Sequence, residues 1–417
     1  MPGKIFPGPV SGTVFAPASK SFMQRAVACA LLCGSETRIH NPSLSADGKA
    51  ALGLAAGLGA DVEVKDKIVV IRPGAHGLEH LLNAGESGLS LRLFTPIAAL
   101  RAEQLEIGAT GSLLRRPVGM MRAPLHRLGV DFSSTDGFPP VQVRGPLKGG
   151  QVQVDASVTS QFLSGLLIAL PVCEGESEIL VSRMTSRPYV DMTLQVLERF
   201  DIHWQVVEGE PLLFRVSGGT SFHCPDFTVP GDWSGAAGLL VAGALAGSVT
   251  VNGLPDDLLQ GDRAILDVLK EAGAMVLVAG ESVSVSKKHL NAFQIDVTNC
   301  PDLVPVLVSL AVHCRGESRI TGTARLRFKE SDRVLVLKRE FGRLGARITI
   351  SEDEIRITGG SIRGGAVSAA GDHRIAMALG VAALNGKGGV EIDDISSVDK
   401  SYPGFFEDLA QIGARIE

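Results

Sequence analysis

The chain has 417 residues, of which 45% are hydrophobic, with 40 Lys and Arg against 45 Asp and Glu. This length is about three times that of a typical domain, so we expect two or three domains. A net charge of -5 and few aromatic residues (16 Phe, 2 Tyr and 2 Trp) argue against a nucleic-acid-binding protein, which needs a basic surface and stacking rings. The composition is typical of a soluble globular protein.

No segment has the pattern of a membrane span or a targeting signal. The longest uncharged run, Trp233 to Pro255, is interrupted by Ser248, Thr250 and Asn252 and predicts a buried helix followed by a strand. The N-terminus has prolines where a secretory signal needs an apolar stretch. We therefore expect a cytoplasmic protein that does not bind membranes.

The cysteines and histidines predict neither disulfides nor a metal site. The six cysteines form no Cys-x-x-Cys pair and lie mostly in apolar segments, which is typical of reduced, buried thiols. No His-Glu-x-x-His pattern, phosphate-binding loop or Gly-x-Gly-x-x-Gly opening occurs. We therefore expect no metal and no cofactor.

A pattern of about 70 residues repeats six times along the chain. Each copy has a predicted helix, then a glycine, then an alternating strand, as expected when glycine takes the left-handed conformation that ends a helix. The glycines are Gly59, Gly129, Gly273, Gly345 and Gly413, and Phe200 stands at this place in the third copy. The steps between these positions are 70, 71, 73, 72 and 68 residues, so we infer an internal repeat.

A second series of helices, apolar and rich in small residues, alternates with the first. These helices begin near Ser19, Ser87, Ser160, Asp232, Asp302 and Asp372, and a β-like run follows each of them. Ser, Thr and Asp at these places are explained most simply as helix caps. The repeat is therefore strand, buried helix, strand, outer helix, glycine and strand.

Six such repeats predict an α/β protein with two domains of three repeats each. We expect one domain at residues 15–227 and a second at 1–14 plus 228–417, with the active site in the cleft between them. Within a domain the buried helices should point the same way, so that their N-termini present free amides and partial positive charge to anions.

Basic residues are concentrated at these helix starts, although the protein is acidic. They are Lys20, Arg25, Arg116, Lys329, Arg333, Arg374 and Lys400. Such a cluster predicts a multiply anionic ligand. Lys329 and Arg333 are four residues apart on a predicted helix, where like charges repel unless a bound anion, or the neighbouring Glu330 and Asp332, neutralises them.

Six motifs in this order resemble those of the 5-enolpyruvylshikimate-3-phosphate synthase family, and they span nearly the whole chain. They are Ala18-Ser19-Lys20-Ser21 with Arg25, Thr159-Ser160-Gln161-Phe162, Ser186-Arg187-Pro188-Tyr189, Lys329-Glu330-Ser331-Asp332-Arg333, Asp372-His373-Arg374 and Lys400-Ser401-Tyr402-Pro403. The resemblance implies two domains, each of three βαβαββ units around buried helices, an inverse α/β barrel. It also implies transfer of the enolpyruvyl group of phosphoenolpyruvate to the 5-hydroxyl of shikimate 3-phosphate, with release of phosphate.

The resemblance also implies a role for individual residues. The contacts to shikimate 3-phosphate fall on Lys20, Ser21, Arg25, Thr159, Ser160, Gln161, Ser186, Tyr189, Asp302 and Lys329. The contacts to phosphoenolpyruvate fall on Lys20, Gly88, Arg116, Gln161, Arg333, Arg374 and Lys400. We expect Asp302 to be the base at the 5-hydroxyl and Glu330, with a raised pKa, the acid at the methylene carbon. Lys20 could share in proton transfer and His373 could donate a hydrogen bond near Glu330.

The largest departure from the family pattern is Glu86, which stands where the family commonly has Asn. A carboxylate that points toward an anion site is unfavourable, so either Glu86 faces a cation or the local phosphoenolpyruvate site differs. Thr159 replaces a usual Ser and keeps the hydroxyl group. The role of Arg325, which stands where some members of the family have Asn, is left open, and so is the response to glyphosate, given Glu86 and Leu89.

Two other functions are possible from the sequence. A UDP-N-acetylglucosamine enolpyruvyl transferase shares the architecture, but that family typically has Lys-Asn in place of Lys20-Ser21 and a reactive Cys in a loop of its N-terminal domain. No cysteine falls in the corresponding loop from Ala109 to Pro117. A noncatalytic anion-binding protein would bind both substrates without releasing phosphate. We expect an enzyme that acts on small molecules as a monomer and closes its domains around them.

Overall fold

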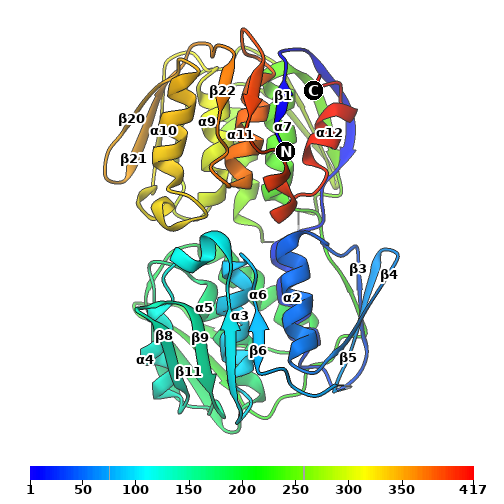
Figure 1. Ribbon diagram of the computed structural model, residues 1–417, viewed down its shortest axis with the longest axis vertical. Helices are drawn as coiled ribbons and strands as arrows, with labels where there is room; N and C mark the ends of the chain where they lie inside the picture. Colours follow the sequence, from blue (N-terminus) through cyan, green and yellow to red (C-terminus); the bar gives the residue numbers. More distant parts are fainter. Residues whose placement is uncertain (75, 257–258) are drawn as a thin grey trace. The chain divides into compact units, whose positions relative to one another are not determined.

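The computed structural model describes residues 1–74, 76–256 and 259–417. The chain divides into two compact units: unit 1 comprises Met1–Pro17 and Pro230–Glu417, and unit 2 comprises Ala18–Val229. Each unit contains three small β-sheets arranged around three apolar helices (Figure 1). The protein is therefore a repeated α/β structure, as the 70-residue pattern predicts.

Unit 2 has three four-stranded sheets. In hydrogen-bonding order, the first contains β14 (Asp226–Thr228), β3 (Thr37–His40), β5 (Ile68–Arg72) and β4 (Asp61–Lys65). The second contains β6 (Leu81–Asn83), β7 (Gln104–Gly108), β9 (Phe138–Arg144) and β8 (Asp131–Thr135). The third contains β10 (Gln151–Ala156), β11 (Glu176–Met184), β13 (Leu212–Ser217) and β12 (Gln205–Val207). In each sheet the first pair is parallel and the other two are antiparallel.

Unit 1 repeats this plan. Its first sheet contains β2 (Val10–Phe15), β15 (Gly247–Asn252), β17 (Ser282–Ser286) and β16 (Met275–Ala279). Its second contains β18 (Gln294–Asp296), β19 (Glu317–Thr321), β21 (Glu354–Thr358) and β20 (Arg347–Ile350). Its third contains β22 (Gly365–Val367), β23 (Val390–Ile392) and β1 (Gly3–Ile5). The N-terminal strand β1 thus completes the last repeat, and Ile5 also pairs with Ile416 near the C-terminus.

The helices form an inner and an outer series. The inner helices are α1 (Lys20–Ala30), α3 (Gly88–Ala98) and α5 (Gln161–Ala169) in unit 2, and α7 (Trp233–Ala246), α9 (Val304–Ala311) and α11 (His373–Ala383) in unit 1. The outer helices are α2 (Ala46–Gly57), α4 (Arg122–Arg127), α6 (Arg187–Arg199), α8 (Ile265–Glu271), α10 (Arg333–Arg343) and α12 (Phe405–Gln411). Short 3-10 helices lie between them: η1 (Gly111–Arg115), η2 (Gly119–Met121), η3 (Leu170–Val172), η4 (Gly261–Ala264), η5 (Pro301–Leu303), η6 (Ala324–Phe328) and η7 (Ser396–Lys400).

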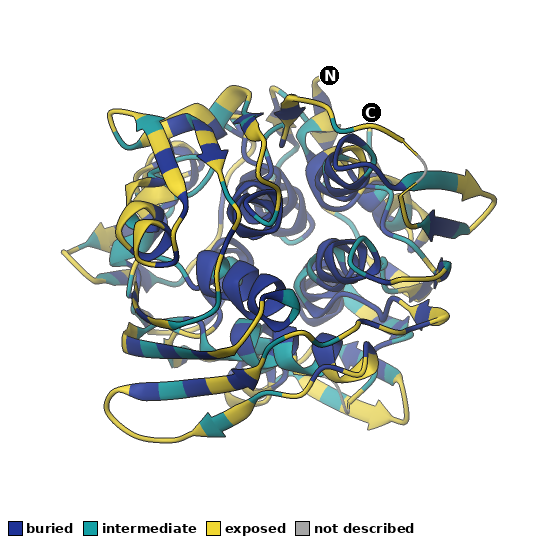
Figure 2. Ribbon diagram, turned by 90° about the horizontal axis from the view of Figure 1, so that it is seen from below, coloured by how far each residue is buried: buried dark blue, intermediate teal, exposed yellow. Residues whose placement is uncertain are grey.

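The inner helices are buried on every side. All residues of α3 and α11 are buried, as expected for helices that are apolar around their whole circumference. The strands around them alternate instead, with one face buried and the other exposed, for example in β10 (Figure 2). Among the described residues, no helix combines the length and apolar character needed to cross a membrane.

The glycines that end the outer helices have the predicted conformation, with one correction. The φ angles of Gly59, Gly129, Gly273, Gly345 and Gly413 lie between 82° and 105°. In the third repeat Asp201, not Phe200, takes this place, with φ 60° after the C-cap residue Phe200. Asp tolerates the left-handed conformation because its short polar side chain can make local hydrogen bonds.

The inner helices approach one another closely where small residues face a neighbouring backbone. A Cβ atom at Gly165 of α5 would lie 2.8 Å from the carbonyl oxygens of Arg92 and Leu93 in α3. Real Cβ atoms do not come that close to backbone, so one of the helices would have to move. Gly165 therefore fixes the distance between the two helices that carry Gly88 and Gln161 at their starts.

Substituting Gly165 tests this packing. We expect Gly165→Ala to lower the free energy of unfolding by about 1–3 kcal/mol, because the overpacking outweighs the better helix propensity of alanine. Gly53→Ala is the matched control, since Gly53 is an exposed glycine of α2 with open space around its Cα. It should raise the free energy of unfolding by about 0.5–1 kcal/mol. Urea denaturation measures both, and equal effects would contradict the packing argument.

Candidate active site

Asp372 is the centre of a buried polar network in unit 1. It is the N-cap residue of α11 and accepts a hydrogen bond from the Arg374 amide at 3.0 Å. Its Oδ2 also accepts from Ser331 Oγ at 3.0 Å and from Arg333 Nε at 2.8 Å. Asp372 and Arg333 are both almost fully buried. The cap of one helix therefore also holds the first residue of another, α10.

Asp302 lies in η5, at the start of α9, and binds three cations. Its Oδ1 accepts from Lys329 Nζ at 3.2 Å and from Arg333 Nη1 at 2.7 Å, and Oδ2 lies 3.4 Å from Arg374 Nη2. The sequence predicted one helix that carries both Lys329 and Arg333. This prediction is wrong, because Lys329 follows η6 and Arg333 begins α10. Their charges are instead brought together by a shared carboxylate, which offsets their repulsion.

Glu330 and His373 lie beside the same network. Glu330 accepts a hydrogen bond from Arg333 Nη2 at 2.7 Å, and its other oxygen lies 3.9 Å from Lys400 Nζ. The ring Nδ1 of His373 lies 3.8 Å from Asp372 Oδ1, and the side chain is buried. All seven predicted residues of unit 1 therefore belong to one connected cluster: Asp302, Lys329, Glu330, Arg333, His373, Arg374 and Lys400.

Burial and charge act in opposite directions on the pKa values of this cluster. Burial lowers the pKa of Lys329 to about 8, although the charge of Asp302 opposes the shift. Burial also acts to lower the pKa of Arg333, but the carboxylates of Asp372, Glu330 and Asp302 outweigh it and raise the pKa. Lys329 is thus a cation whose charge can be lost near neutral pH, whereas Arg333 stays charged.

In unit 2, polar residues gather at the first turns of α1, α2 and α3. Lys20, the first residue of α1, forms an ion pair with Asp47 of α2 at 2.9 Å. Gln24 lies one turn further along α1 and donates from Nε2 to the Asp47 carbonyl, to Ser87 Oγ at 2.7 Å and to Ser90 Oγ at 3.1 Å. Ser87 is the N-cap residue of α3 and accepts from the Ser90 amide. One buried side chain thus aligns three helix starts.

Arg92 brings the predicted phosphoenolpyruvate contacts of unit 2 together. It donates to Gln161 Oε1 at 2.8 Å and to the Pro117 carbonyl at 2.8 Å. The guanidinium of Arg116 lies against the Cα of Gly88, where a Cβ would be only 2.6 Å from Arg116 Nη1. Gly88, Arg116 and Gln161 are therefore held around the start of α3.

Arg25 joins α1 to α6, and Ser186 and Tyr189 lie at the start of α6. Arg25 donates to Thr193 Oγ1 at 2.8 Å and to the Tyr189 carbonyl at 2.9 Å, and burial lowers its pKa to about 10. Ser186 precedes α6 with φ 57°, a left-handed conformation that is costly for serine. Arg25 thus serves to connect two helices, whatever else it contacts.

The remaining predicted contacts are hydroxyl groups at the starts of α1 and α5. Ser21 is the second residue of α1. Ser160 is the N-cap residue of α5, and Thr159 before it accepts from the Gln161 amide at 3.3 Å. These groups lie at the ends of helices whose other residues are almost all buried.

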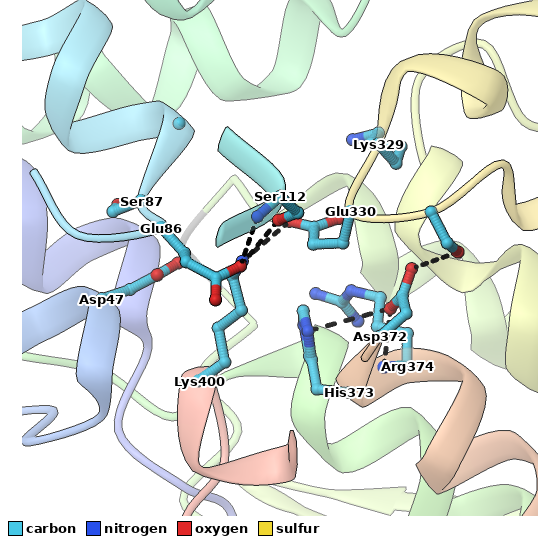
Figure 3. A network of polar contacts seen from close by, with 12 residues as sticks. Asp47, Glu86, Ser87, Ser112, Lys329, Glu330, Asp372, His373, Arg374 and Lys400 are labelled. Carbon is cyan, nitrogen blue, oxygen red and sulfur yellow. Dashed lines mark hydrogen bonds and ion pairs between the residues drawn. The ribbon is translucent and has the colours of Figure 1, made fainter. Parts of the chain in front are cut away.

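Glu86 does not contradict a site at the start of α3. Its Oε2 accepts from the amide of Ser112 at 3.1 Å and from Ser112 Oγ at 2.7 Å (Figure 3). The two hydrogen bonds join the carboxylate to the segment that carries Arg116, and they do not decide between the two expectations for Glu86, a neighbouring cation or a changed local site. Arg325, whose role the sequence leaves open, donates to the Thr298 carbonyl.

Sequence reasoning missed three carboxylates in these clusters. Asp47 pairs with Lys20, Asp372 binds Arg333, and Asp262 lies buried near Asp302. Burial raises the pKa of Asp262 to about 6, and the charge of Asp302 adds to the shift. Only Asp372 had a sequence signal, its place before an apolar helix, and that signal predicts a cap. Among the described residues, no three His, Cys, Asp or Glu side chains form a group that could hold a metal ion.

Comparison with known proteins identifies the fold and the family. The chain superposes on the solved structure of EPSP synthase from Acinetobacter baumannii with a TM-score of 0.83 and 26% identity, covering 100% of this chain and 99% of that one. It therefore has the two-domain, inside-out α/β fold. The sequence model for EPSP synthase (3-phosphoshikimate 1-carboxyvinyltransferase) matches residues 6–409.

Two relatives named 3-phosphoshikimate 1-carboxyvinyltransferase agree. The one from Aeropyrum pernix is 40% identical over 415 residues, covering 99% of this chain and 96% of the relative. The one from Methanothrix thermoacetophila is 40% identical over 417 residues, covering 98% and 97%. The chain belongs to the EPSP synthase family.

Substitution of Asp372 tests the network of unit 1. Asp372→Asn keeps an oxygen for the helix cap but removes one of the three carboxylates that bind the buried Arg333, so we expect a loss of about 1.5–3 kcal/mol of unfolding free energy. Asp332→Asn is the control, because Asp332 is the N-cap residue of α10 at a more exposed place and Asn caps equally well. It should change the free energy by less than about 0.5 kcal/mol. Calorimetry that found both variants equally stable would contradict the central place of Asp372.

Proposed function

We propose that the two clusters act together in the reaction of the family. That reaction transfers the enolpyruvyl group of phosphoenolpyruvate to the 5-hydroxyl of shikimate 3-phosphate and releases phosphate, and the chain performs it in the shikimate pathway of aromatic amino-acid biosynthesis. The observation that carries the proposal is the cluster around Asp302 and Glu330, in which two carboxylates share Arg333 and are surrounded by cations.

The chemistry requires an acid, a base and strong stabilisation of anions. In the first step the 5-hydroxyl oxygen bonds to C2 of phosphoenolpyruvate, loses its proton, and the methylene carbon gains a proton to become a methyl group. In the second step the methyl group loses a proton, the bond from C2 to the phosphate oxygen breaks, and phosphate leaves. Each proton transfer needs a group within hydrogen-bonding distance of the reacting atom.

Asp302 and Glu330 are suited to these roles in different ways. The cations around Asp302 favour its ionised form, which can accept a proton from the 5-hydroxyl. Glu330 also faces Arg333, whose charge favours the ionised form of the carboxyl group. We propose that bound phosphoenolpyruvate, by taking up positive charge from Arg333 and Lys400, raises the pKa of Glu330 so that it can protonate the methylene carbon.

The cations stabilise the two phosphates and the carboxylate. The predicted sets are Lys20, Ser21, Arg25, Thr159, Ser160, Gln161, Ser186, Tyr189, Asp302 and Lys329 for shikimate 3-phosphate, and Lys20, Gly88, Arg116, Gln161, Arg333, Arg374 and Lys400 for phosphoenolpyruvate. Lys20 and His373 remain candidates for assistance in proton transfer. Fixed cations lower the barrier because they need no reorganisation when charge develops in the transition state.

Phosphate release tests the reaction and its two carboxylates. The chain should release phosphate from phosphoenolpyruvate with shikimate 3-phosphate, and not with UDP-N-acetylglucosamine or without an acceptor. Asp302→Asn and Glu330→Gln should each lower kcat by about 10²–10⁴-fold, the usual contribution of a general acid or base. Glu391→Gln, an exposed residue of β23, is the control and should have no effect. Wild-type kcat in both variants would refute the roles of Asp302 and Glu330.

The lowered pKa of Lys329 predicts that the use of shikimate 3-phosphate depends on pH. Because its pKa is lowered to about 8, the free enzyme loses this charge above that pH, and a neutral amine binds a phosphate more weakly. The kcat/KM for shikimate 3-phosphate should therefore fall as pH rises through about 8. Lys329→Arg keeps its charge at high pH, so its profile should stay flat through that range. Identical profiles of wild type and variant would show that another group titrates.

The predicted contacts for both substrates come from both units, so we propose that substrate binding draws the units together in a cytoplasmic monomer. Anions should offset the repulsion among the cations that the two units contribute. Small-angle scattering should show a smaller radius of gyration with shikimate 3-phosphate and a phosphoenolpyruvate analogue than without them. An unchanged radius with both sites saturated would contradict closure.

A further inference from the structure

The segment that carries Arg116 is fastened to the start of α3 at both of its ends. At the first end, the Thr110 amide donates to the Gly85 carbonyl at 2.8 Å. At the far end, Arg92 Nη2 donates to the Pro117 carbonyl at 2.8 Å. Between these points the chain forms only the short helix η1, so its backbone needs further contacts to stay in one place.

Glu86 supplies a contact in the middle of this segment. A single carboxylate oxygen, Oε2, accepts from both the amide and the hydroxyl of Ser112 (Figure 3). The turn of the segment is shaped around this carboxylate: Gly111 has φ 54°, and a Cβ there would lie 2.3 Å from Glu86 Oε1. Any residue other than glycine at this place would displace Glu86.

The position of Arg116 depends on the same few residues. The Arg116 guanidinium is mostly buried and lies against Gly88, two residues after Glu86. The short stretch from Glu86 to Gly88 therefore contacts both Ser112 in the segment and the Arg116 side chain. A shift of the segment by even 1 Å would move the guanidinium away from the helix start, and misplacement of that size can cost much of a catalytic contact.

We propose that Glu86 is a positioning residue, which holds Ser112 and thereby fixes Arg116 at the start of α3 for an anionic group of phosphoenolpyruvate. This inference rests on the proposed function for its substrate. Hydrogen bonds to a carboxylate are stronger than those between neutral groups, which explains how a side chain of this charge is useful beside an anion site. In this proposal, the free energy that the ordered segment contributes to substrate binding exceeds the repulsion between Glu86 and the substrate.

The alternative to a positioning role is that Glu86 only repels the anionic substrate. The KM values of two variants distinguish positioning from repulsion. If Glu86 positions Arg116, Glu86→Ala raises the KM for phosphoenolpyruvate by about tenfold to a hundredfold, with a smaller change for shikimate 3-phosphate. Glu86→Gln should recover most of this loss, because an amide oxygen can accept the same two hydrogen bonds. If Glu86 only repels the substrate, both variants lower the KM, and that result would overturn the proposal.

A double-mutant cycle shows whether the effect passes through Arg116. In an Arg116→Ala background, Glu86→Ala should change the KM for phosphoenolpyruvate less than twofold, since the side chain to be positioned is already absent. An effect as large as in the wild-type background would mean that Glu86 acts elsewhere, and the proposal would fail. Glu103→Ala, an exposed residue before β7, is the matched carboxylate control and should leave the KM unchanged in both backgrounds.

Hydrogen exchange tests the contact without any substrate. The peptide that contains Ser112 should exchange at least tenfold faster in Glu86→Ala than in wild type or Glu103→Ala, while peptides from α3 stay protected. Unchanged exchange would overturn the proposal even if the enzyme is active. If exchange rises as expected but no variant or wild type releases phosphate with shikimate 3-phosphate, the proposed function fails and the role of Glu86 in ordering the segment stands.

Discussion

The site depends on one constraint: the inner helices are buried along their length, and most of their polar residues lie in or near the first turns. α3 and α11 have no exposed residue, and their N-cap residues Ser87 and Asp372 are also buried. Polar groups at these places cannot reach water freely, so they must bind one another or a ligand. Gln24, which donates to three acceptors, and Asp372, which binds Arg333 and Ser331, are the consequence of this constraint in the two units.

The same constraint explains why so many cations lie beside carboxylates. A buried guanidinium such as that of Arg333 is costly unless opposite charges surround it, and Asp302, Glu330 and Asp372 do so. We infer that the carboxylates keep the cations in place until anionic substrates arrive. Asp372 is fully buried and stays on Arg333, whereas Asp302 is partly exposed and can release cations to a substrate.

The sequence was sufficient for the repeat and the helix starts, because glycine and capping residues determine helix ends through local backbone conformation. Asp201 was missed because glycine is the residue most typical of this place, although Asp can take the same φ. The pairs Lys20 with Asp47 and Arg333 with Asp372 join residues far apart in the chain, and nothing in the local pattern indicates such partners. The contact of Glu86 with Ser112 could not be predicted for the same reason, since it depends on how the segment after β7 returns to α3.

We infer that cations held by Asp302 in the free enzyme bind the substrates instead. A crystal structure with shikimate 3-phosphate and an unreactive phosphoenolpyruvate analogue tests this inference most directly. We predict that Lys329 and Arg374 move from Asp302 onto substrate oxygens, while Arg333 keeps its contact with Asp372 and donates from Nη1 to the analogue. Arg116 should bind the analogue while its guanidinium stays in contact with Gly88. Ligands bound away from these side chains, with every contact of Asp302 unchanged, would contradict the account.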